Sequence, residues 1–391
     1  MADNGSMTAR GLLNSDGNYA AQHQAMYDLL KYIQVGQSLP ETLEAYEYRL
    51  RLNFLALIYV LWQQLSPLWE AYGKVKSDST ECKDRVYPSI LNVADLTLTY
   101  ARNAAGMDGE SPYSHIFQCV RDLANATDQE EADRLSKEID NFISVQTGKI
   151  DDLNSQSSVC TENLRSLEGR MVASQDVVKQ RSDDLHEAIA QMVEDAENTE
   201  KQLKTLREKV AQTTAPYEQD QLVACAAPSY KWLELSGTIV MSAITSVRGS
   251  DATKIANLAD DVWAIIANDG GEKKDRHSIL ADLLAIDADL TAVLTPVNTA
   301  IGVVEQMMGS WTAISDDLAN LGKMVKDDIK SANEYIANLN EKKIISNWKD
   351  LAEAVEKYQG AAEARLKSTS DSSTSISMEE LAQQLREQAN S

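Results

Sequence analysis

The sequence holds few side chains whose types and spacing suit metal binding. The chain has 4 His and 4 Cys. His115 and Cys119 are four residues apart, so on a helix they would share one face, as two metal ligands must. No third or fourth ligand is evident beside them, and a zinc site needs three or four. The sequence therefore predicts no metal ion and no cofactor.

The cysteines show neither a CxxC motif nor the spacing of a metal site. They are Cys82, Cys119, Cys160 and Cys225. Buried free thiols are the simplest interpretation. A Cys82–Cys119 disulfide is the alternative, because both residues fall near predicted turns.

Paired carboxylates are abundant but unsuited to catalysis. Neighbouring residues on a helix point about 100° apart, so such a pair cannot converge on one substrate atom. The pairs are Asp151/Asp152, Asp183/Asp184, Asp260/Asp261, Asp316/Asp317 and Asp327/Asp328. We interpret them as solvated helix faces. The chain also has no GxSxG, P-loop, GxGxxG or HExxH motif, so the sequence does not predict an enzyme.

The composition favours an acidic, helical protein. A net charge of −23 repels the phosphates of nucleic acid, and the basic residues form no patch. Apolar residues make up 43% of the chain, and with 7 Pro and 17 Gly long uninterrupted helices are expected. No apolar stretch has the length of a membrane-spanning helix, and residues 1–20 show no signal-peptide pattern.

A heptad pattern predicts one very long helix over residues 128–212. One row of mostly apolar residues recurs every seven positions from Ile143 through Leu164 and Leu185. A companion apolar row follows it three residues later at first and four residues later toward the end of the helix. That drift is expected for a nearly straight helix that packs along its length. Helices are also expected at 21–36, 41–76, 84–105 and 112–125, with a break at 77–83.

A second heptad row predicts a returning helix over residues 277–343. Its apolar positions run from Leu283 to Leu339, and a companion row three residues on runs from Ile286 to Leu321. The two rows include the residues that we expect to pack inside the bundle: Trp311, Ile314, Leu318 and Leu321. Two such helices joined by a compact insert must run antiparallel. The predicted fold is therefore all-α, an elongated bundle of long antiparallel helices with a small apolar head insert.

The domain boundaries follow from these elements. Residues 1–20 are predicted to be a mobile arm, 21–212 and 277–366 the helical bundle, and 213–276 the head insert. Residues 367–391 are predicted to form a Ser-rich linker and a short helix.

The head insert contains the most apolar window outside the bundle, Leu222–Val247. It has the pattern of a hairpin, and its conformation, helical or β, stays open. One interpretation is a helical cap that seals the bundle. The other is an element that inserts into lipid when released, with Trp263, Ile265 and Ile266 as interfacial support. The residues that would then enter the membrane are Trp232, Leu233, Leu235, Ile239, Val240, Met241, Ile244 and Val247.

This layout resembles the cytolysin A superfamily of α-helical pore-forming toxins, which includes haemolysin BL-type and xenorhabdolysin-type components. The stretch Gln306–Leu321 is similar to the returning helix of those proteins. Charged residues in the head, such as Lys231 and Glu234, depart from the most lytic relatives and suggest one component of a multi-subunit toxin.

The resemblance implies a function and partners. The expected protein is a soluble monomer, secreted without a recognisable signal peptide, whose head inserts into a target-cell membrane. Lipid, other copies of the chain in a homo-oligomeric pore, and a second or third toxin component are the implied partners; nucleic acid is not. The alternative is a non-lytic structural or adaptor helical-bundle protein.

Overall fold

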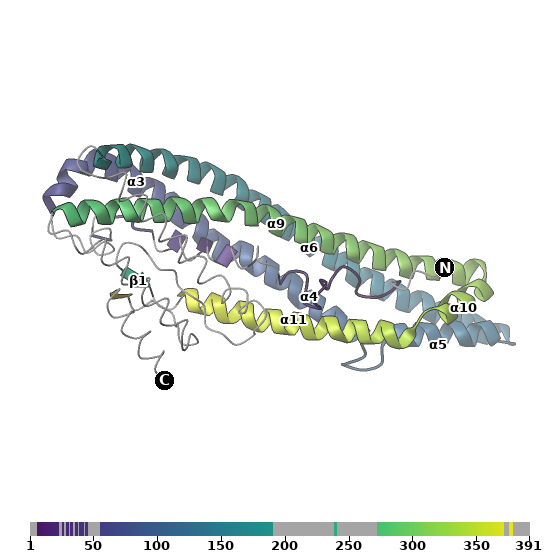
Figure 1. Ribbon diagram of the computed structural model, residues 1–391. Coiled ribbons are helices and arrows are strands. Elements are labelled where there is room, and N and C mark those ends of the chain that lie inside the picture. Colours follow the sequence, from purple (N-terminus) through teal and green to yellow (C-terminus); the bar gives the residue numbers. More distant parts are fainter. Residues whose placement is uncertain are drawn as a thin grey trace, which may run out of the picture. The chain divides into compact units, whose positions relative to one another are not determined.

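Helices make up most of the computed structural model (Figure 1). It describes residues 6–22, individual residues between 26 and 45, and residues 55–190, 238–240, 272–370 and 375–377. The chain forms two compact units. Unit 1 comprises Met1–His23, Arg85–Arg165 and Thr299–Gly360, and unit 2 comprises Gln24–Asp84, Ser166–Asn298 and Ala361–Ser391.

The all-α prediction is confirmed for the described residues. The helices are α3 (Leu55–Glu81), α4 (Tyr87–Ala104), α5 (Pro112–Asn125), α6 (Gln129–Ala190), α9 (Glu272–Asp327), α10 (Ile329–Asn338) and α11 (Glu341–Ser370). A π-helical turn, η1 (Cys82–Val86), joins α3 to α4. The described residues also include a short antiparallel pair of strands, β1 (Thr238–Val240) and β2 (Ser375–Ser377).

The predicted break at 77–83 is wrong, because the helical path continues through η1. The polar side chains there are satisfied locally: the hydroxyls of Ser79 and Thr80 both donate to the carbonyl of Lys76, at 2.8 Å. Pro88 stands in the first turn of α4, directly after η1. A π turn is wider than an α turn, so it can accommodate the missing N–H and the bulk of the proline ring.

Helix α6 buries the predicted heptad row as far as the structure describes it. The row is no more than 8% exposed at Ile143, Ile150, Ser157, Leu164, Met171, Val178 and Leu185. The predicted positions beyond residue 190 lie outside the described residues. The described helix has 62 residues.

Within unit 1, α9 packs antiparallel to α6, as predicted. Contacts join Lys326 to Asp140 and Asn154 to Thr312, and Arg165 pairs with Glu305. As residue numbers rise along α6 they fall along α9. Both predicted rows of α9 are buried where described, at Val297, Ala300, Val304, Met307, Trp311, Ile314, Leu318, Leu321 and Val325.

The returning helix does not run unbroken to 343, and that prediction is wrong. Asp328 leaves the helical conformation and its side chain accepts from the N–H groups of Lys330 and Ser331, which caps a new helix, α10. A second interruption at residues 339–340 precedes α11, where the Asn340 side chain accepts from Lys343 N at 3.0 Å. A capping side chain stabilises a fresh helix start, so the chain changes direction where the heptad row continues. Helix α10 lies beside α5 (Figure 1).

The prediction of buried free thiols is confirmed for three of the four cysteines, and Cys225 lies outside the described residues. Cys82, Cys119 and Cys160 are all buried and unbridged, so the alternative Cys82–Cys119 disulfide is wrong. Burial raises the pKa of the Cys160 thiol to about 11. Among the described residues, no helix combines the length and the apolar character that crossing a bilayer demands.

Candidate functional site

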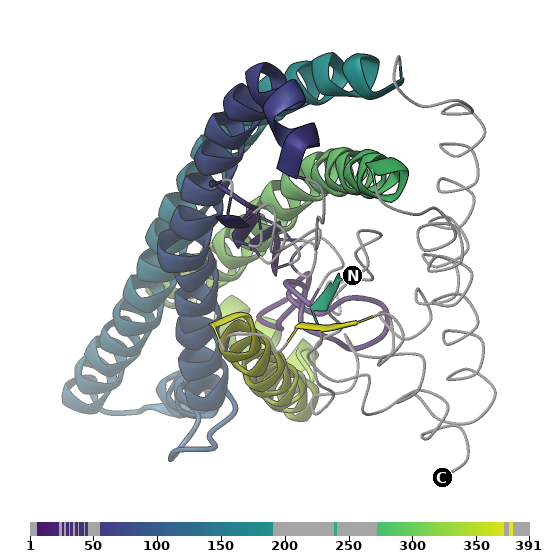
Figure 2. The same cartoon turned by 90° about the vertical axis from the view of Figure 1, so that its left-hand side faces the viewer.

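Two parts of the predicted head, residues 213–276, are described: residues 272–276, which begin α9, and the strand Thr238–Val240, which pairs with the C-terminal tail (Figure 2). In this register Ile239 is opposite Ile376 and Val240 is opposite Ser375. Residues 375–377 thus form a strand that pairs with the head, where the sequence predicts only a linker. The other predicted membrane-inserting and interfacial residues, from Trp232 to Ile266, lie outside the described residues.

The residues predicted to pack inside the bundle are all fully buried. Trp311, Ile314, Leu318 and Leu321 are each 0% exposed on α9. Trp311 stacks on Trp348 of α11 with ring centroids 6.0 Å apart, and Tyr100 of α4 meets both rings edge-on. Tyr113 of α5 also stacks on Trp348, with ring centroids 5.9 Å apart.

This aromatic cluster joins four helices of unit 1. The hydroxyls of Tyr100 and Tyr113 are 2.9 Å apart and share a hydrogen bond. Burial raises the pKa of both tyrosines, so both remain neutral hydrogen-bonding groups. Aromatic pairs in these geometries each add about 0.5–1.5 kcal/mol beyond their buried area. Trp348 stands at the centre of the cluster, and sequence analysis did not single it out.

The N-terminal segment, residues 6–22, packs onto unit 1, which contradicts the prediction of a mobile arm for this part. Met7, Leu12 and Tyr19 are each 0% exposed. A turn stabilised by Asn14, whose side chain accepts from the N–H groups of Asp16 and Asn18, brings Leu13 opposite Tyr19. The buried side chains, at positions 7, 8, 9, 12, 19 and 21, follow no helical period, which explains why the sequence resembled a polar arm.

Backbone contacts fix this N-terminal segment to two helices. Met7 donates its N–H to Asp317 of α9 at 2.9 Å, and its carbonyl accepts from the Trp348 indole of α11 at 3.0 Å. Ala9 donates its N–H to the Asn347 side chain at 2.7 Å. Met7 has a φ of 60°, a left-handed conformation that costs a non-glycine residue about 1–2 kcal/mol. The contacts on both sides hold it there.

Asp317 corrects the interpretation of the Asp316/Asp317 pair as a solvated face. Its carboxylate also accepts from Arg10 at 3.0 Å, and its side chain is only 16% exposed. Gly11 lies directly against Ser310, where an added Cβ would come within 2.3 Å of the hydroxyl oxygen. The N-terminal segment is therefore held on α9 by the Asp317 carboxylate and by the close packing of Gly11 against Ser310.

A separate polar cluster joins α3 to α6 in unit 2. Asp78 accepts from Arg170 at 3.2 Å and from the Ser174 hydroxyl at 2.7 Å. Arg170 also pairs with Glu81 at 3.1 Å. Asp78 is only 9% exposed, so its hydrogen bonds specify how these helices pack.

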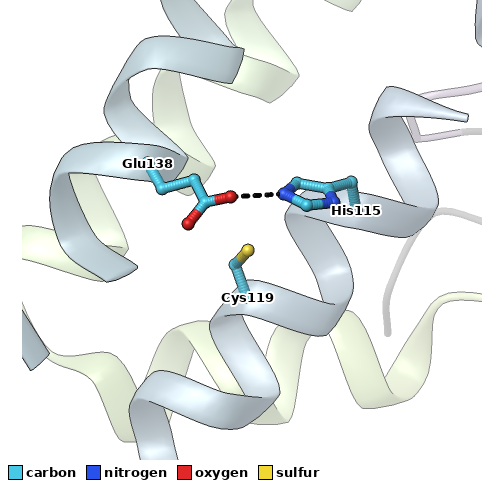
Figure 3. Close-up of side chains that lie close together, drawn as sticks. All are labelled: His115, Cys119 and Glu138. Atoms are coloured by element: carbon cyan, nitrogen blue, oxygen red, sulfur yellow. Dashed lines mark hydrogen bonds and ion pairs between the residues drawn. The ribbon is translucent and has the colours of Figure 1, made fainter. Parts of the chain in front are cut away.

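His115 and Cys119 have a third polar neighbour that sequence analysis did not find. The Glu138 carboxylate of α6 lies 2.8 Å from His115 Nε2 and accepts its hydrogen bond in the tautomer that carries the proton there. One ligand atom from each of these three residues lies within 4.8 Å of the others (Figure 3). The conclusion that no third ligand is present is wrong, because the turn between α5 and α6 brings Glu138 back beside them.

The structural features described above define a helical bundle in which a head segment and an N-terminal segment are held by other parts of the chain. This fold is that of the soluble components of tripartite α-pore-forming toxins. Neither protein-family models nor curated proteins match the sequence.

Solved structures of two such components, and of one further toxin component, have the same fold. Soluble SmhA of the tripartite toxin Smh from Serratia marcescens superposes with a TM-score of 0.60 and 9% identity, over 92% of this chain and 96% of that chain. The HblL1 toxin component of Bacillus cereus gives 0.54 and 11% identity, over 95% and 99%. Soluble AhlB of the tripartite toxin AHL from Aeromonas hydrophila gives 0.51 and 11% identity, over 97% and 99%.

Proposed function

We propose that this protein is one component of a multi-subunit α-helical pore-forming toxin. In this proposal it is a secreted, soluble protein whose head, residues 213–276, inserts into a target-cell membrane. The proposal is supported most by the shared fold with soluble components of tripartite α-pore-forming toxins, over 92% or more of this chain.

The chemistry of the head supports a role in lipid. The segment 222–247 carries only Lys231 and Glu234 as charged residues and is otherwise rich in Leu, Ile, Val and Ala. Burial of each large aliphatic side chain in lipid gains about 1.5–3 kcal/mol, and interfacial tryptophans such as Trp232 and Trp263 favour the headgroup level.

A conformational switch requires that the head be held by contacts weak enough to break at a membrane. The strand Thr238–Val240 pairs with Ser375–Ser377, and three backbone positions form a small interface that lipid burial can outweigh. In the proposed mechanism the head leaves this partner and inserts. Heptad faces of the bundle then exchange internal partners for those of neighbouring protomers, in a homo-oligomer or with other components.

The test is association of the purified full-length chain with liposomes, followed by flotation, chemical cross-linking and dye release. We expect lipid-dependent oligomers for the wild-type protein. Val240→Asp should weaken association roughly 100-fold, because a carboxylate inside the bilayer costs about 2.5–3.5 kcal/mol. Val172→Asp is the matched control: Val172 is 44% exposed on α6, and this variant should behave like the wild type.

Absence of lipid-dependent oligomers and of dye release in the wild-type protein would contradict the proposal. That result would favour the alternative, a non-lytic adaptor bundle. Equal association of the Val240→Asp variant and the wild type would show that this part of the head does not enter lipid.

A further inference from the structure

The most chemically distinctive cluster among the described residues lies between α5 and α6. Figure 3 shows the side chains of His115 and Cys119, from successive turns of α5, directed toward Glu138 of α6. The three residues offer an imidazole nitrogen, a sulfur and a carboxylate oxygen. Nothing in the pore-forming mechanism uses them.

We propose that His115, Cys119 and Glu138 form a binding site for a divalent transition-metal ion of the Zn²⁺ type. Their ligand atoms lie within 4.8 Å of one another, and the imidazole and carboxylate atoms are 2.8 Å apart. Zinc bonds of about 2.0–2.3 Å place tetrahedral ligand atoms about 3.3–3.8 Å apart. Small side-chain rotations therefore suffice to surround an ion, with water in the fourth position.

The neighbouring side chains orient two of these ligands. Glu110 lies 3.7 Å from His115 Nδ1, and its carboxylate is placed to accept the Nδ1 proton when a metal ion replaces the proton on Nε2 that now faces Glu138. Arg134 donates to the far oxygen of Glu138 at 2.8 Å and leaves the near oxygen facing the histidine. Such outer partners are typical of protein metal sites.

The local charge also favours a cation. The carboxylates of Glu138, Asp122 and Glu110 and the guanidinium of Arg134 all lie close enough to act electrostatically on the Cys119 side chain. Three negative charges against one positive charge attract a divalent ion.

The ligand types select the class of metal. Nitrogen and sulfur donors suit Zn²⁺ and Co²⁺, whereas Mg²⁺ and Ca²⁺ require oxygen ligands. A bound ion would fasten α5 to the first turns of α6. It would stabilise that corner of unit 1 by an amount that grows with the free metal concentration.

The test is titration of the full-length protein with Co²⁺ and then with Zn²⁺. We expect one Co²⁺ per chain, a thiolate-to-cobalt charge-transfer band in the near ultraviolet, and its loss when Zn²⁺ displaces cobalt. Cys119→Ser should abolish the band. Cys160→Ala, which removes another buried thiol of unit 1, should retain the charge-transfer band.

Two further variants keep the test independent of folding. Glu138→Gln and His115→Gln preserve size and helical preference, and each should weaken Zn²⁺ binding at least about tenfold while far-ultraviolet dichroism stays unchanged. Zn²⁺ should raise the melting temperature of the wild type and not that of these variants. Absence of the band in the wild type, or its persistence in Cys119→Ser, would overturn the proposal.

Discussion

The carboxylate of Asp317 should govern how firmly the N-terminal segment, residues 6–22, is held. It accepts from Met7 N at 2.9 Å and from Arg10 at 3.0 Å. A hydrogen bond to a charged group contributes about 1.5–3 kcal/mol. Arg10 is 31% exposed, so its ion pair adds at most about 1 kcal/mol. Asp317→Ala should therefore ease opening of the segment by about 2–3 kcal/mol, or roughly 30- to 150-fold.

The assay is native-state hydrogen exchange followed by mass spectrometry. The amides of Ala9, Leu12 and Ala20 keep their acceptors in the variant, so they report opening of the segment rather than loss of one bond. The exchange rates of these three amides should rise roughly 30- to 150-fold in Asp317→Ala, while the exchange rates of amides in α4 and α6 should not change.

Asp316→Ala is the matched control, because Asp316 is the adjacent residue and is exposed. In this variant the exchange rates of the Ala9, Leu12 and Ala20 amides should stay within about threefold of the wild-type rates, because most surface substitutions change stability little. Equal exchange in the two variants, or no acceleration in Asp317→Ala, would refute the conclusion that this carboxylate anchors the segment.

Three other predictions concern the packing of the bundle. Trp311→Ala should lower the free energy of unfolding, measured in urea titrations, by about 3–5 kcal/mol because it removes a fully buried indole. Val172→Ala, at an exposed position, should change it by less than about 0.5 kcal/mol. Equal losses of stability in the two variants would contradict the conclusion that the Trp311 indole stabilises the bundle. Asp78→Ala should destabilise by about 1–3 kcal/mol because it leaves Arg170 and the Ser174 hydroxyl without this acceptor, and the same change at the exposed Asp84 is the comparison. Burial raises the pKa of the Cys160 thiol from 9.0 to about 11, so this thiol should resist thiol reagents at neutral pH. The stability that the neutral buried thiol contributes is complete below pH 9.0 and is lost as the pH rises toward 11. Rapid modification of Cys160 in the folded protein would argue against its burial.

The long helices were predictable because their burial follows a local rule. A residue such as Leu164 or Leu318 lies on the apolar stripe by its spacing alone, and both are fully buried. The antiparallel packing of α6 and α9 followed from the same rows. Where α10 begins, a signal was present but not used: Asp328 and Ser331 form a capping pattern inside the heptad row.

The contacts that hold the ends of the chain were not predictable from spacing. Met7 meets Trp348 across 341 positions of sequence, and no periodic pattern connects two such residues. Glu138 could have been found, since an antiparallel return after the turn between α5 and α6 brings the start of α6 beside His115. The partner of the head strand, Ser375–Ser377, was hidden because a Ser/Thr-rich stretch is typical of a linker.

The most direct test of the central claim is a reversible lock between the head and the tail. Ile239 and Ile376 are opposite one another in the strand pair, so the double variant Ile239→Cys/Ile376→Cys should form a disulfide, and each single variant is a control. We predict that the oxidised protein neither binds liposomes nor forms lipid-dependent oligomers, and that reduction restores both. Undiminished membrane association of the locked protein would contradict release of the head as the step that leads into the membrane.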